Sequence, residues 1–227
     1  MSVYYQDDYV TLYHGDCLQQ TEWLDADVLV TDPPYGIAWL TRGAYGGKAN
    51  NKGLVKEKNV IANDENSDIR DQVLLLWASK PAIVFGSWKV DRPKKTNHRL
   101  IWHKSGMPPG PLKAAFMSQD EEIYVLGEGF KKSSPPLRSV IKTTEHRPQA
   151  VSVTGHPTPK PIGLMETLIE RCPDGVIADP FAGSGATLIA ARNLGRKAVG
   201  VELEEKYCEI IASRLANQTF DFSQLEN

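Results

Sequence analysis

The chain has 227 residues, of which 41% are hydrophobic, 24% charged and 8% aromatic, and its formal net charge is −2. This length and composition support a full hydrophobic core and exclude a collagen-like or a largely disordered chain. The sequence contains no apolar run near the roughly 18 residues needed to cross a bilayer, and its first residues do not resemble a secretory signal. We therefore expect a soluble, cytoplasmic protein with one domain over residues 1–227 and no membrane partner.

The chain has three cysteines, Cys17, Cys172 and Cys208, and no C-x-x-C pair. An odd number without such a pair argues against a disulfide framework and against a zinc site. We expect reduced, buried thiols. The histidines show no ligand spacing, so no metal is predicted.

Positive charge is concentrated in three segments. Residues 42–58 contain five Lys/Arg and one acid, residues 89–104 six and one, and residues 131–147 five and one. If these segments converge on one face, they can neutralise a phosphate backbone, whereas the alternative is solvated surface loops.

The periodicity of apolar residues in the first part of the chain predicts strands at 10–14, 27–31 and 82–85, with a helix over 68–79. Between the second strand and the helix, residues 36–67 are rich in Gly, Asn and Lys and have no clear period. Loops longer than about 12–15 residues in a compact domain are usually functional or disordered. This long basic loop is therefore a candidate functional segment.

In the second part of the chain, strands are predicted at 100–103 and 122–126, and residues 127–155 are aperiodic. A helix is expected to begin at Pro161, followed by a strand at 176–179, a helix at 187–194, a strand at 198–202 and a helix at 204–216. This alternation predicts an α/β fold with a single doubly wound, mainly parallel sheet and helices on both faces. Because ligands bind such sheets at the carboxyl ends of the strands, we expect the site at that edge, where Asp16, Asp32, Asp179 and Glu202 all fall.

The loop from Asp179 to Gly185 joins a predicted strand to a predicted helix and contains two glycines. Its backbone can therefore approach a ligand closely at the start of a helix. Glu202 ends the next strand, in the position from which a carboxylate holds ribose hydroxyls. The pattern indicates a nucleoside-containing cofactor, and a tight structural turn is the alternative.

The segment Asp32-Pro33-Pro34-Tyr35 combines a strand-terminal carboxylate, two rigid prolines and an aromatic ring. The Asp32 carboxylate and the Pro33 carbonyl can accept the two N–H groups of a planar amine while Tyr35 stacks on its ring. Drawing these hydrogens out of the ring plane frees the nitrogen lone pair for attack. The alternative is an ordinary Asp-Pro turn.

Taken in order, TDPPYG (31–36), HPTPKP (156–161), DPFAGSGAT (179–187) and GVE (200–202) resemble the DNA amino-methyltransferases that use S-adenosylmethionine. The order is that of the permuted beta arrangement, in which the catalytic motif precedes the cofactor motif, and the resemblance covers almost the whole chain. It departs from the family pattern at Pro159, where Gln is usual, and at Ala186, where Thr is common. The resemblance implies a Rossmann-like methyltransferase fold, S-adenosylmethionine as cofactor and double-stranded DNA as partner, with the target base flipped.

The resemblance also implies roles for individual residues. The catalytic motif comprises Asp32, Pro33, Pro34 and Tyr35. The cofactor residues are Asp179, Phe181, Gly183, Ser184 and Gly185 of the loop, Glu202 for the ribose, Asp16 for the adenine end, and Thr158 and Lys160 for the methionine carboxylate. Glu122 resembles part of a further strand of the catalytic half and has no assigned role.

An aspartate at the head of the catalytic motif is more similar to the adenine-N6 members than to the cytosine-N4 members. We therefore expect a site-specific DNA-methyltransferase of the restriction-modification type that methylates adenine N6 by direct in-line displacement. Cytosine N4 is the main alternative, followed by an RNA or protein amine. A catalytically silent binding module is disfavoured because it would be expected to lose Asp32 or the glycines.

Residues 127–154 form a small predicted target-recognition segment, to which the loop 36–67 or a second subunit of a homodimer would add contacts. The candidate phosphate contacts are Arg42, Lys48, Lys52, Lys94, Lys95, Lys131, Lys132, Arg138 and Arg147.

Overall fold

The computed structural model describes residues 3–35, 68–105, 116, 119–144, 156 and 158–221, and for residues 218–221 only the backbone. Within these ranges no helix is long and apolar enough to span a membrane. The three cysteines are buried free thiols, which confirms the prediction for them.

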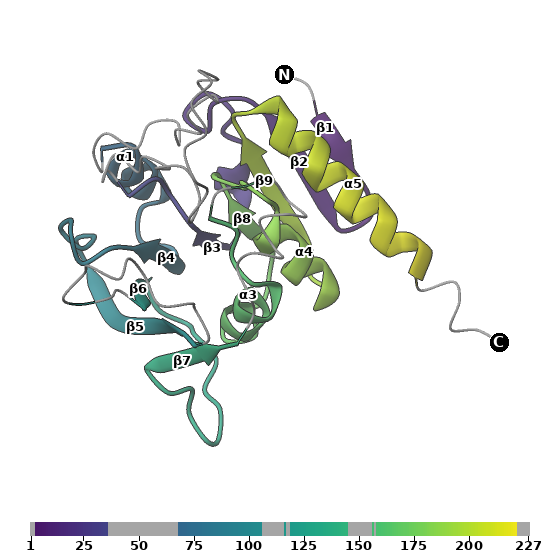
Figure 1. The fold of residues 1–227 in the computed structure, drawn as a ribbon. Coiled ribbons are helices and arrows are strands. Elements are labelled where there is room, and N and C mark those ends of the chain that lie inside the picture. The colour runs from purple at the N-terminus through teal and green to yellow at the C-terminus, as the bar shows by residue number, and fades with distance from the viewer. Residues whose placement is uncertain are drawn as a thin grey trace, which may run out of the picture.

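The described residues form a nine-stranded sheet in the order β1-β2-β9-β8-β3-β4-β6-β5-β7 (Figure 1). Its strands are β1 (Val3–Gln6), β2 (Val10–His14), β3 (Val28–Thr31), β4 (Ala82–Gly86), β5 (Thr96–Lys104), β6 (Asp120–Leu126), β7 (Val140–Thr143), β8 (Ile177–Asp179) and β9 (Ala198–Glu202). The five neighbours β2, β9, β8, β3 and β4 are mutually parallel. β6 runs antiparallel between β4 and β5, and β1 antiparallel to β2. The predicted single, mainly parallel sheet is confirmed.

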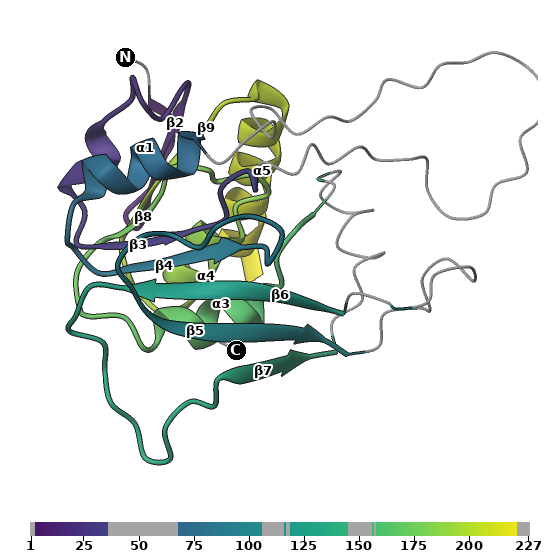
Figure 2. The same cartoon turned by 90° about the vertical axis from the view of Figure 1, so that its left-hand side faces the viewer.

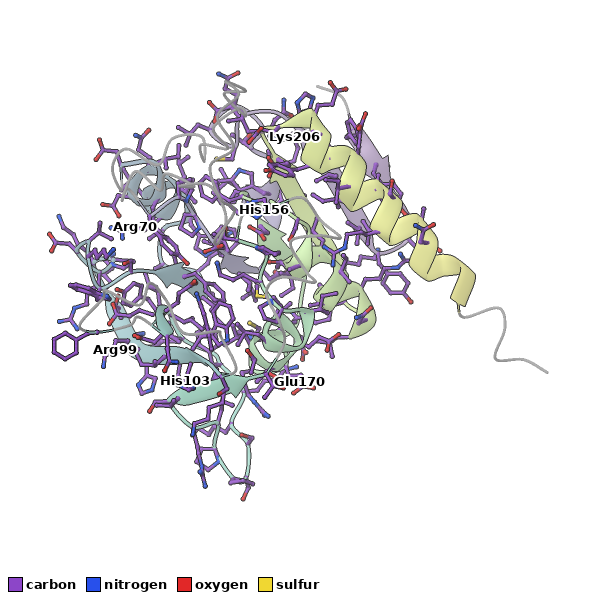
Figure 3. The ribbon with its side chains drawn as sticks, viewed as in Figure 1. Arg70, Arg99, His103, His156, Glu170 and Lys206 are labelled. Carbon is purple, nitrogen blue, oxygen red and sulfur yellow. The ribbon has the colours of Figure 1, made fainter. Side chains whose placement is uncertain are left out.

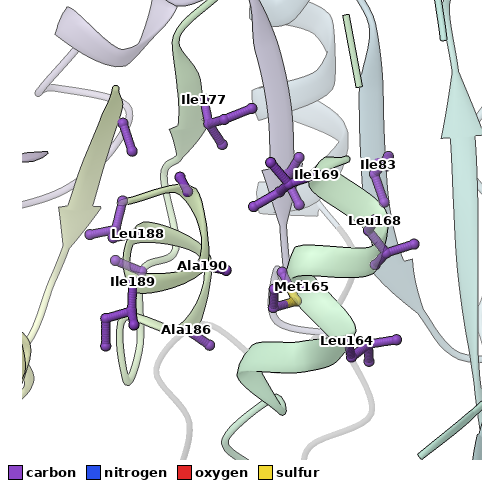
Figure 4. Close-up of a cluster of buried hydrophobic side chains, with 14 of the residues drawn as sticks. Ile83, Leu164, Met165, Leu168, Ile169, Ile177, Ala186, Leu188, Ile189 and Ala190 are labelled. Carbon is purple, nitrogen blue, oxygen red and sulfur yellow. The ribbon is translucent and has the colours of Figure 1, made fainter. Parts of the chain in front are cut away.

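Helices cover both faces of the sheet, as predicted. One face carries α3 (Ile162–Ile169), α4 (Ala186–Asn193) and α5 (Glu205–Asp221), and the other carries the 3-10 helix η1 (Glu22–Asp25) and α1 (Asp68–Trp77). Side chains alternate along β3, so this strand contributes to the hydrophobic layer on each face of the sheet. Val28 and Val30 pack with α3 to α5, while Leu29 packs with η1 and α1. Figure 4 shows the apolar side chains of α3 and α4 packed against the sheet.

On the second face, Trp23 of η1 stacks on Trp77 of α1 with ring centroids 5.8 Å apart. Both indoles are fully buried, so this pair closes the smaller hydrophobic layer.

Two strands were not expected from the sequence. β1 and β7 each have four residues, and Ile141 is the single buried side chain of β7. Such short edge strands carry too little alternation to be recognised, so the expectation that residues 127–155 lack regular structure was wrong for 140–143.

The carboxyl ends of β2, β9, β8, β3 and β4 define one edge of the sheet, here called the carboxyl edge. In Figure 2 the arrowheads of β4, β5 and β7 point the same way and that of β6 points the opposite way. Asp16, Glu202, Asp179 and Asp32 follow or end four adjacent strands at this edge in that spatial order. Their position at one edge was predicted from the sequence, and the structure adds the order. With strands about 4.8 Å apart, these four positions span about 14 Å.

Candidate active site

In the loop after β8, the backbone conformation favours glycine at two positions. Gly183 and Gly185 have φ values of +53° and +80°, and a Cβ atom on Gly185 would lie 2.9 Å from Ile211 Cγ1. Asp179 begins the loop, and its Oδ1 accepts hydrogen bonds from Thr31 Oγ1 at 2.7 Å and from Phe181 N at 3.1 Å. The Thr31 contact ties the cofactor loop directly to the strand that precedes Asp32.

Two further residues of the predicted loop have mainly packing roles. Ser184 is buried and its carbonyl accepts from the guanidinium of Arg214, while the half-buried ring of Phe181 packs against the smaller hydrophobic layer.

The carboxylate of Glu202 bonds to the same loop after β8. Its Oε2 accepts from Gly183 N at 2.7 Å and its Oε1 from Glu204 N at 2.9 Å. Burial raises the pKa of Glu202 to about 7 and that of Asp179 to about 6. These carboxylates are held by neutral donors, and each oxygen keeps acceptor capacity for hydroxyl groups of a ligand.

Asp16 lies beyond the end of β2, beside Glu202. Gly15 N donates to the Glu202 carbonyl at 2.9 Å, and Asp16 Oδ1 accepts from Leu18 N at 2.9 Å, so Asp16 also closes a local turn. Gln20, which the sequence analysis missed, packs against Gly15: a Cβ atom added to Gly15 would lie 3.0 Å from Gln20 Cγ. Its buried Oε1 has no hydrogen-bond partner among the described residues. An acceptor without a partner beside two carboxylates fits a ligand that supplies N–H and O–H donors.

His156 packs against the glycine loop, and Thr158 lies beside His156. The ring of His156 (Figure 3) lies edge-on to that of Tyr207 near the start of α5, with ring centroids 4.8 Å apart. A Cβ atom added to Gly183 would lie 3.1 Å from His156 Nε2. Thr158 N is 3.3 Å from His156 Nδ1. Thr158 is thus linked to the glycine loop through His156, and its predicted role at the methionine carboxylate stays a prediction.

Asp32 and Tyr35 interact directly just after β3. Tyr35 Oη lies 2.7 Å from Asp32 Oδ1 and 2.9 Å from Glu121 Oε2. Pro33 is buried between them, and Pro34 is half-buried. The catalytic segment is thus anchored by its tyrosine hydroxyl to a carboxylate that is distant in sequence.

Lys160 occupies a different environment from the one that the sequence suggested. Its ammonium is bonded to Asp32 Oδ2 and lies 3.3 Å from Glu121 Oε2, and its side chain is only 6% exposed. It also lies over the rings of Tyr35 and Phe85. The structure therefore groups Lys160 with the catalytic segment, whereas the sequence analysis assigned it to the methionine carboxylate.

Glu121, like Gln20, is a residue of the candidate site that sequence reasoning missed. Its Oε1 binds the Lys104 ammonium, while Oε2 faces Lys160 and Tyr35. Glu122, which the sequence analysis noted instead, points to the other face, where it bonds to Arg99 at 2.8 Å and to Tyr124 Oη at 2.5 Å. Because side chains alternate along β6, the two neighbouring glutamates face opposite sides of the sheet.

The pKa values in this cluster follow from burial and ion pairing. Burial alone would raise the pKa of Glu121, but the ammonium groups of Lys160 and Lys104 lower it to about 2. The pKa of Asp32 is raised, because burial and the Glu121 charge outweigh the effect of Lys160. Two acids in contact with the same lysine thus differ in proton affinity, and Asp32 is the more basic one.

Several predicted phosphate contacts lie away from this edge. Thr96 and Ala82 both align with Leu126, which places the start of β5 and the end of β6 at the opposite, amino edge of the sheet. Lys94, Lys95, Lys131 and Lys132 flank these points, and Lys131 pairs there with Asp174 at 2.5 Å. These four lysines thus lie at the edge opposite the carboxyl edge: Lys94 and Lys95 because they precede β5, and Lys131 and Lys132 because β6 runs antiparallel to its neighbours.

The remaining basic candidates divide into two groups. Arg138 is exposed and lies just before β7. Arg42, Lys48, Lys52 and Arg147, with the whole loop 36–67, fall outside the described residues. Within the described ranges, no group of three or more His, Cys, Asp or Glu side chains is placed to hold a metal ion.

Comparison with known proteins places the chain among nucleic-acid-modifying enzymes. The DNA methylase family model N6_N4_Mtase matches residues 26–213. The type II methyltransferase M.ScaI of Streptomyces caespitosus is 26% identical over 257 residues, covering 93% of this chain and 83% of its own length.

Two solved structures have a similar fold. The M1.HpyAVI–SAM complex has a TM-score of 0.63 at 21% identity and covers 91% of this chain and 98% of its own. The PvuII DNA methyltransferase, described as cytosine-N4-specific, also has a TM-score of 0.63, at 15% identity, and covers 92% of this chain and 87% of its own. These structural matches confirm the predicted methyltransferase fold.

Proposed function

Because the chain belongs to the DNA methylase family, we propose that it transfers a methyl group to the exocyclic N6 amine of adenine in DNA. The position of Asp32 carries this proposal. Its carboxylate follows β3, and Thr31 Oγ1 joins that strand to Asp179 of the cofactor loop at 2.7 Å. An aspartate, and not a serine, at this position favours adenine over cytosine by the family resemblance.

S-adenosylmethionine is the cofactor, and when bound it supplies an electrophilic methyl group that the exocyclic nitrogen takes by direct displacement. The residues available to hold it are the Gly183–Gly185 backbone, Glu202 for the ribose hydroxyls and Asp16 for the adenine end, with Gln20 Oε1 as a further acceptor. The carboxylates and the unpaired amide oxygen at this end match a donor-rich nucleoside.

In the catalytic segment, Asp32 and the Pro33 carbonyl accept the two hydrogens of the target amine. These contacts bring the nitrogen towards tetrahedral geometry and make its lone pair available. After transfer, the extra proton on nitrogen passes to Asp32 or to water, and the raised pKa of Asp32 suits it to this role.

Tyr35 provides the stacking surface for the target base. Its hydroxyl is held by Asp32 and Glu121, so the plane of its ring is set before the base arrives. An adenine amine lies inside a duplex, so the target base is proposed to be flipped out. Phosphate contacts are proposed for Arg42, Lys48, Lys52, Arg138 and Arg147, and a second subunit of a homodimer would add to them.

Cytosine N4 is the second candidate target. The acceptors at Asp32 and Pro33 recognise an exocyclic amine, and Tyr35 recognises a flat ring, and both features are common to adenine and cytosine.

The test is to incubate the purified protein with S-adenosylmethionine and unmethylated DNA of mixed sequence, digest the DNA to nucleosides and quantify methylated bases by mass spectrometry. We expect N6-methyladenine with the wild-type protein and none with Asp32→Ala. N4-methylcytosine would establish the second candidate, and the absence of any methylated base would contradict both.

A further inference from the structure

Glu121 and Asp32 share the same two hydrogen-bond donors. Tyr35 Oη lies 2.7 Å from Asp32 Oδ1 and 2.9 Å from Glu121 Oε2, and the Lys160 ammonium reaches Asp32 Oδ2 and the same Glu121 oxygen. The four side chains form a closed ring in which the two carboxylates are connected only through shared donors. The ring is largely buried, with 6% of the Lys160, 21% of the Asp32 and 16% of the Glu121 side chain exposed.

The Tyr35 hydroxyl has one hydrogen for two carboxylate oxygens. When that hydrogen points to Glu121, Asp32 Oδ1 has a free acceptor position, and when it points to Asp32, that position is partly used. Lys160 has three hydrogens, so it can bond to Asp32 Oδ2 while it also faces Glu121 Oε2 at 3.3 Å. Glu121 therefore competes with Asp32 for the Tyr35 hydrogen and shares the Lys160 ammonium with it, and both of these donors favour the ionised form of Asp32.

We propose that Glu121 is a positioning residue for methyl transfer, which shares Tyr35 and Lys160 with Asp32 and so keeps the Asp32 carboxylate a strong acceptor for the target amine. This inference rests on the proposed function for the identity of the amine. It assigns to Glu121 a role that acts entirely through Asp32. The transfer itself is unchanged, since the proton leaves the amine nitrogen for Asp32 or water.

The surroundings of Asp32 support this role. The charged and titratable groups that face it are Tyr35 from its own segment, Glu121 from β6, Lys160 before α3 and Asp179 from β8, with Lys104 of β5 behind Glu121. The Glu121 charge raises the pKa of Asp32, whereas Lys160 and the Tyr35 hydrogen bond lower it. Removing Glu121 or Tyr35 should therefore change the proton affinity of Asp32 in opposite directions.

The first experiment follows the titration of the Asp32 carboxyl carbon by 13C NMR in the free protein, without DNA or cofactor. In Glu121→Gln the titration should move to lower pH by about one unit, and in Tyr35→Phe it should move to higher pH. Glu122→Gln, the neighbouring acid on the opposite face, should leave it unchanged. A titration that does not move in Glu121→Gln, or that moves in the same direction in both variants, would overturn the inference.

The second experiment measures single-turnover methylation against pH. Glu121→Gln should slow transfer by about 10-fold to 100-fold and move the acid limb of the profile to lower pH, with KM for DNA nearly unchanged. A slower rate with an unmoved acid limb would indicate a merely structural role and contradict the proposal. The NMR titration needs no methylation, so a wild-type protein that methylates nothing would defeat the proposed function without deciding the role of Glu121.

Discussion

The two halves of the carboxyl edge hold their carboxylates by different means. At the cofactor end, Glu202 and Asp179 are held by backbone N–H groups and a threonine hydroxyl, and burial raises their pKa values to about 7 and about 6. At the catalytic end, Glu121 is held by two lysines and its pKa falls to about 2. The proposed cofactor end is thus suited to hydroxyl donors of a ligand. At the catalytic end, the two carboxylates are already paired with lysines before any ligand binds.

The largest expected effect is at the catalytic end. Asp32→Asn removes the proton acceptor but keeps the shape of the side chain, so methylation should fall by about 1,000-fold. Cofactor affinity, measured by calorimetry, should change by less than about two-fold, because Asp32 is not among the cofactor residues. A comparable loss of affinity and rate would show that the two halves are not separable.

The next effect concerns the glycine loop at the cofactor end. Gly185→Ala forces a side chain into φ +80° and against Ile211, and should lower the free energy of unfolding by about 2–3 kcal/mol. Gly195→Ala is the matched control, since its φ is +67° but a Cβ atom there meets nothing within 4 Å. It should cost only about 1 kcal/mol. Equal losses in urea unfolding would mean that backbone strain alone requires glycine at position 185.

A smaller and pH-dependent effect is expected for Glu202→Gln. The folded-state pKa of Glu202 is about 7 against an ordinary value of 4.5, so its contribution to stability is fully present below pH 4.5 and is lost as pH rises through 7. Glutamine cannot ionise, so the variant should become more stable than the wild type by about 1 kcal/mol at pH 8 and show little advantage at pH 4.5.

The same substitution should weaken cofactor binding about 10-fold to 100-fold, because a charged acceptor for the ribose is removed. Glu166→Gln, at an acid of α3 that accepts a hydrogen bond from Asn193, serves as the control for both measurements. If Glu202→Gln bound the cofactor normally, the ribose role of Glu202 would have to be abandoned.

The smallest effect is expected far from both halves. Lys131→Ala with Lys132→Ala alters the amino edge, so the salt dependence of DNA binding should keep its slope. Lys48→Ala with Lys52→Ala, in the predicted phosphate-binding loop, should reduce that slope by about one for each phosphate that is no longer neutralised. If the Lys131→Ala, Lys132→Ala variant instead showed a reduced salt-dependence slope, the amino edge would have to be part of the DNA interface.

The motifs and the strands that carry them were readable from the sequence because their signals are local. A short apolar run ending in Asp32, or in Asp179 before two glycines, identifies a strand and its carboxyl end without knowledge of its neighbours. Parallel strands then bring these ends to one edge, and for this reason Asp16, Glu202, Asp179 and Asp32 lie in adjacent positions as expected.

Whether Glu121 or Glu122 faces the site, which partner Lys160 takes, and at which edge Lys131 lies were decided only by the tertiary structure. Each depends on the direction and register of β6, which pairs antiparallel with β4 and β5. Because side chains alternate along a strand, a one-residue difference in register exchanges the two glutamates between faces. That register is set by the packing of Ile123 against residues distant in sequence, so it cannot be read from the EEIYVL segment alone.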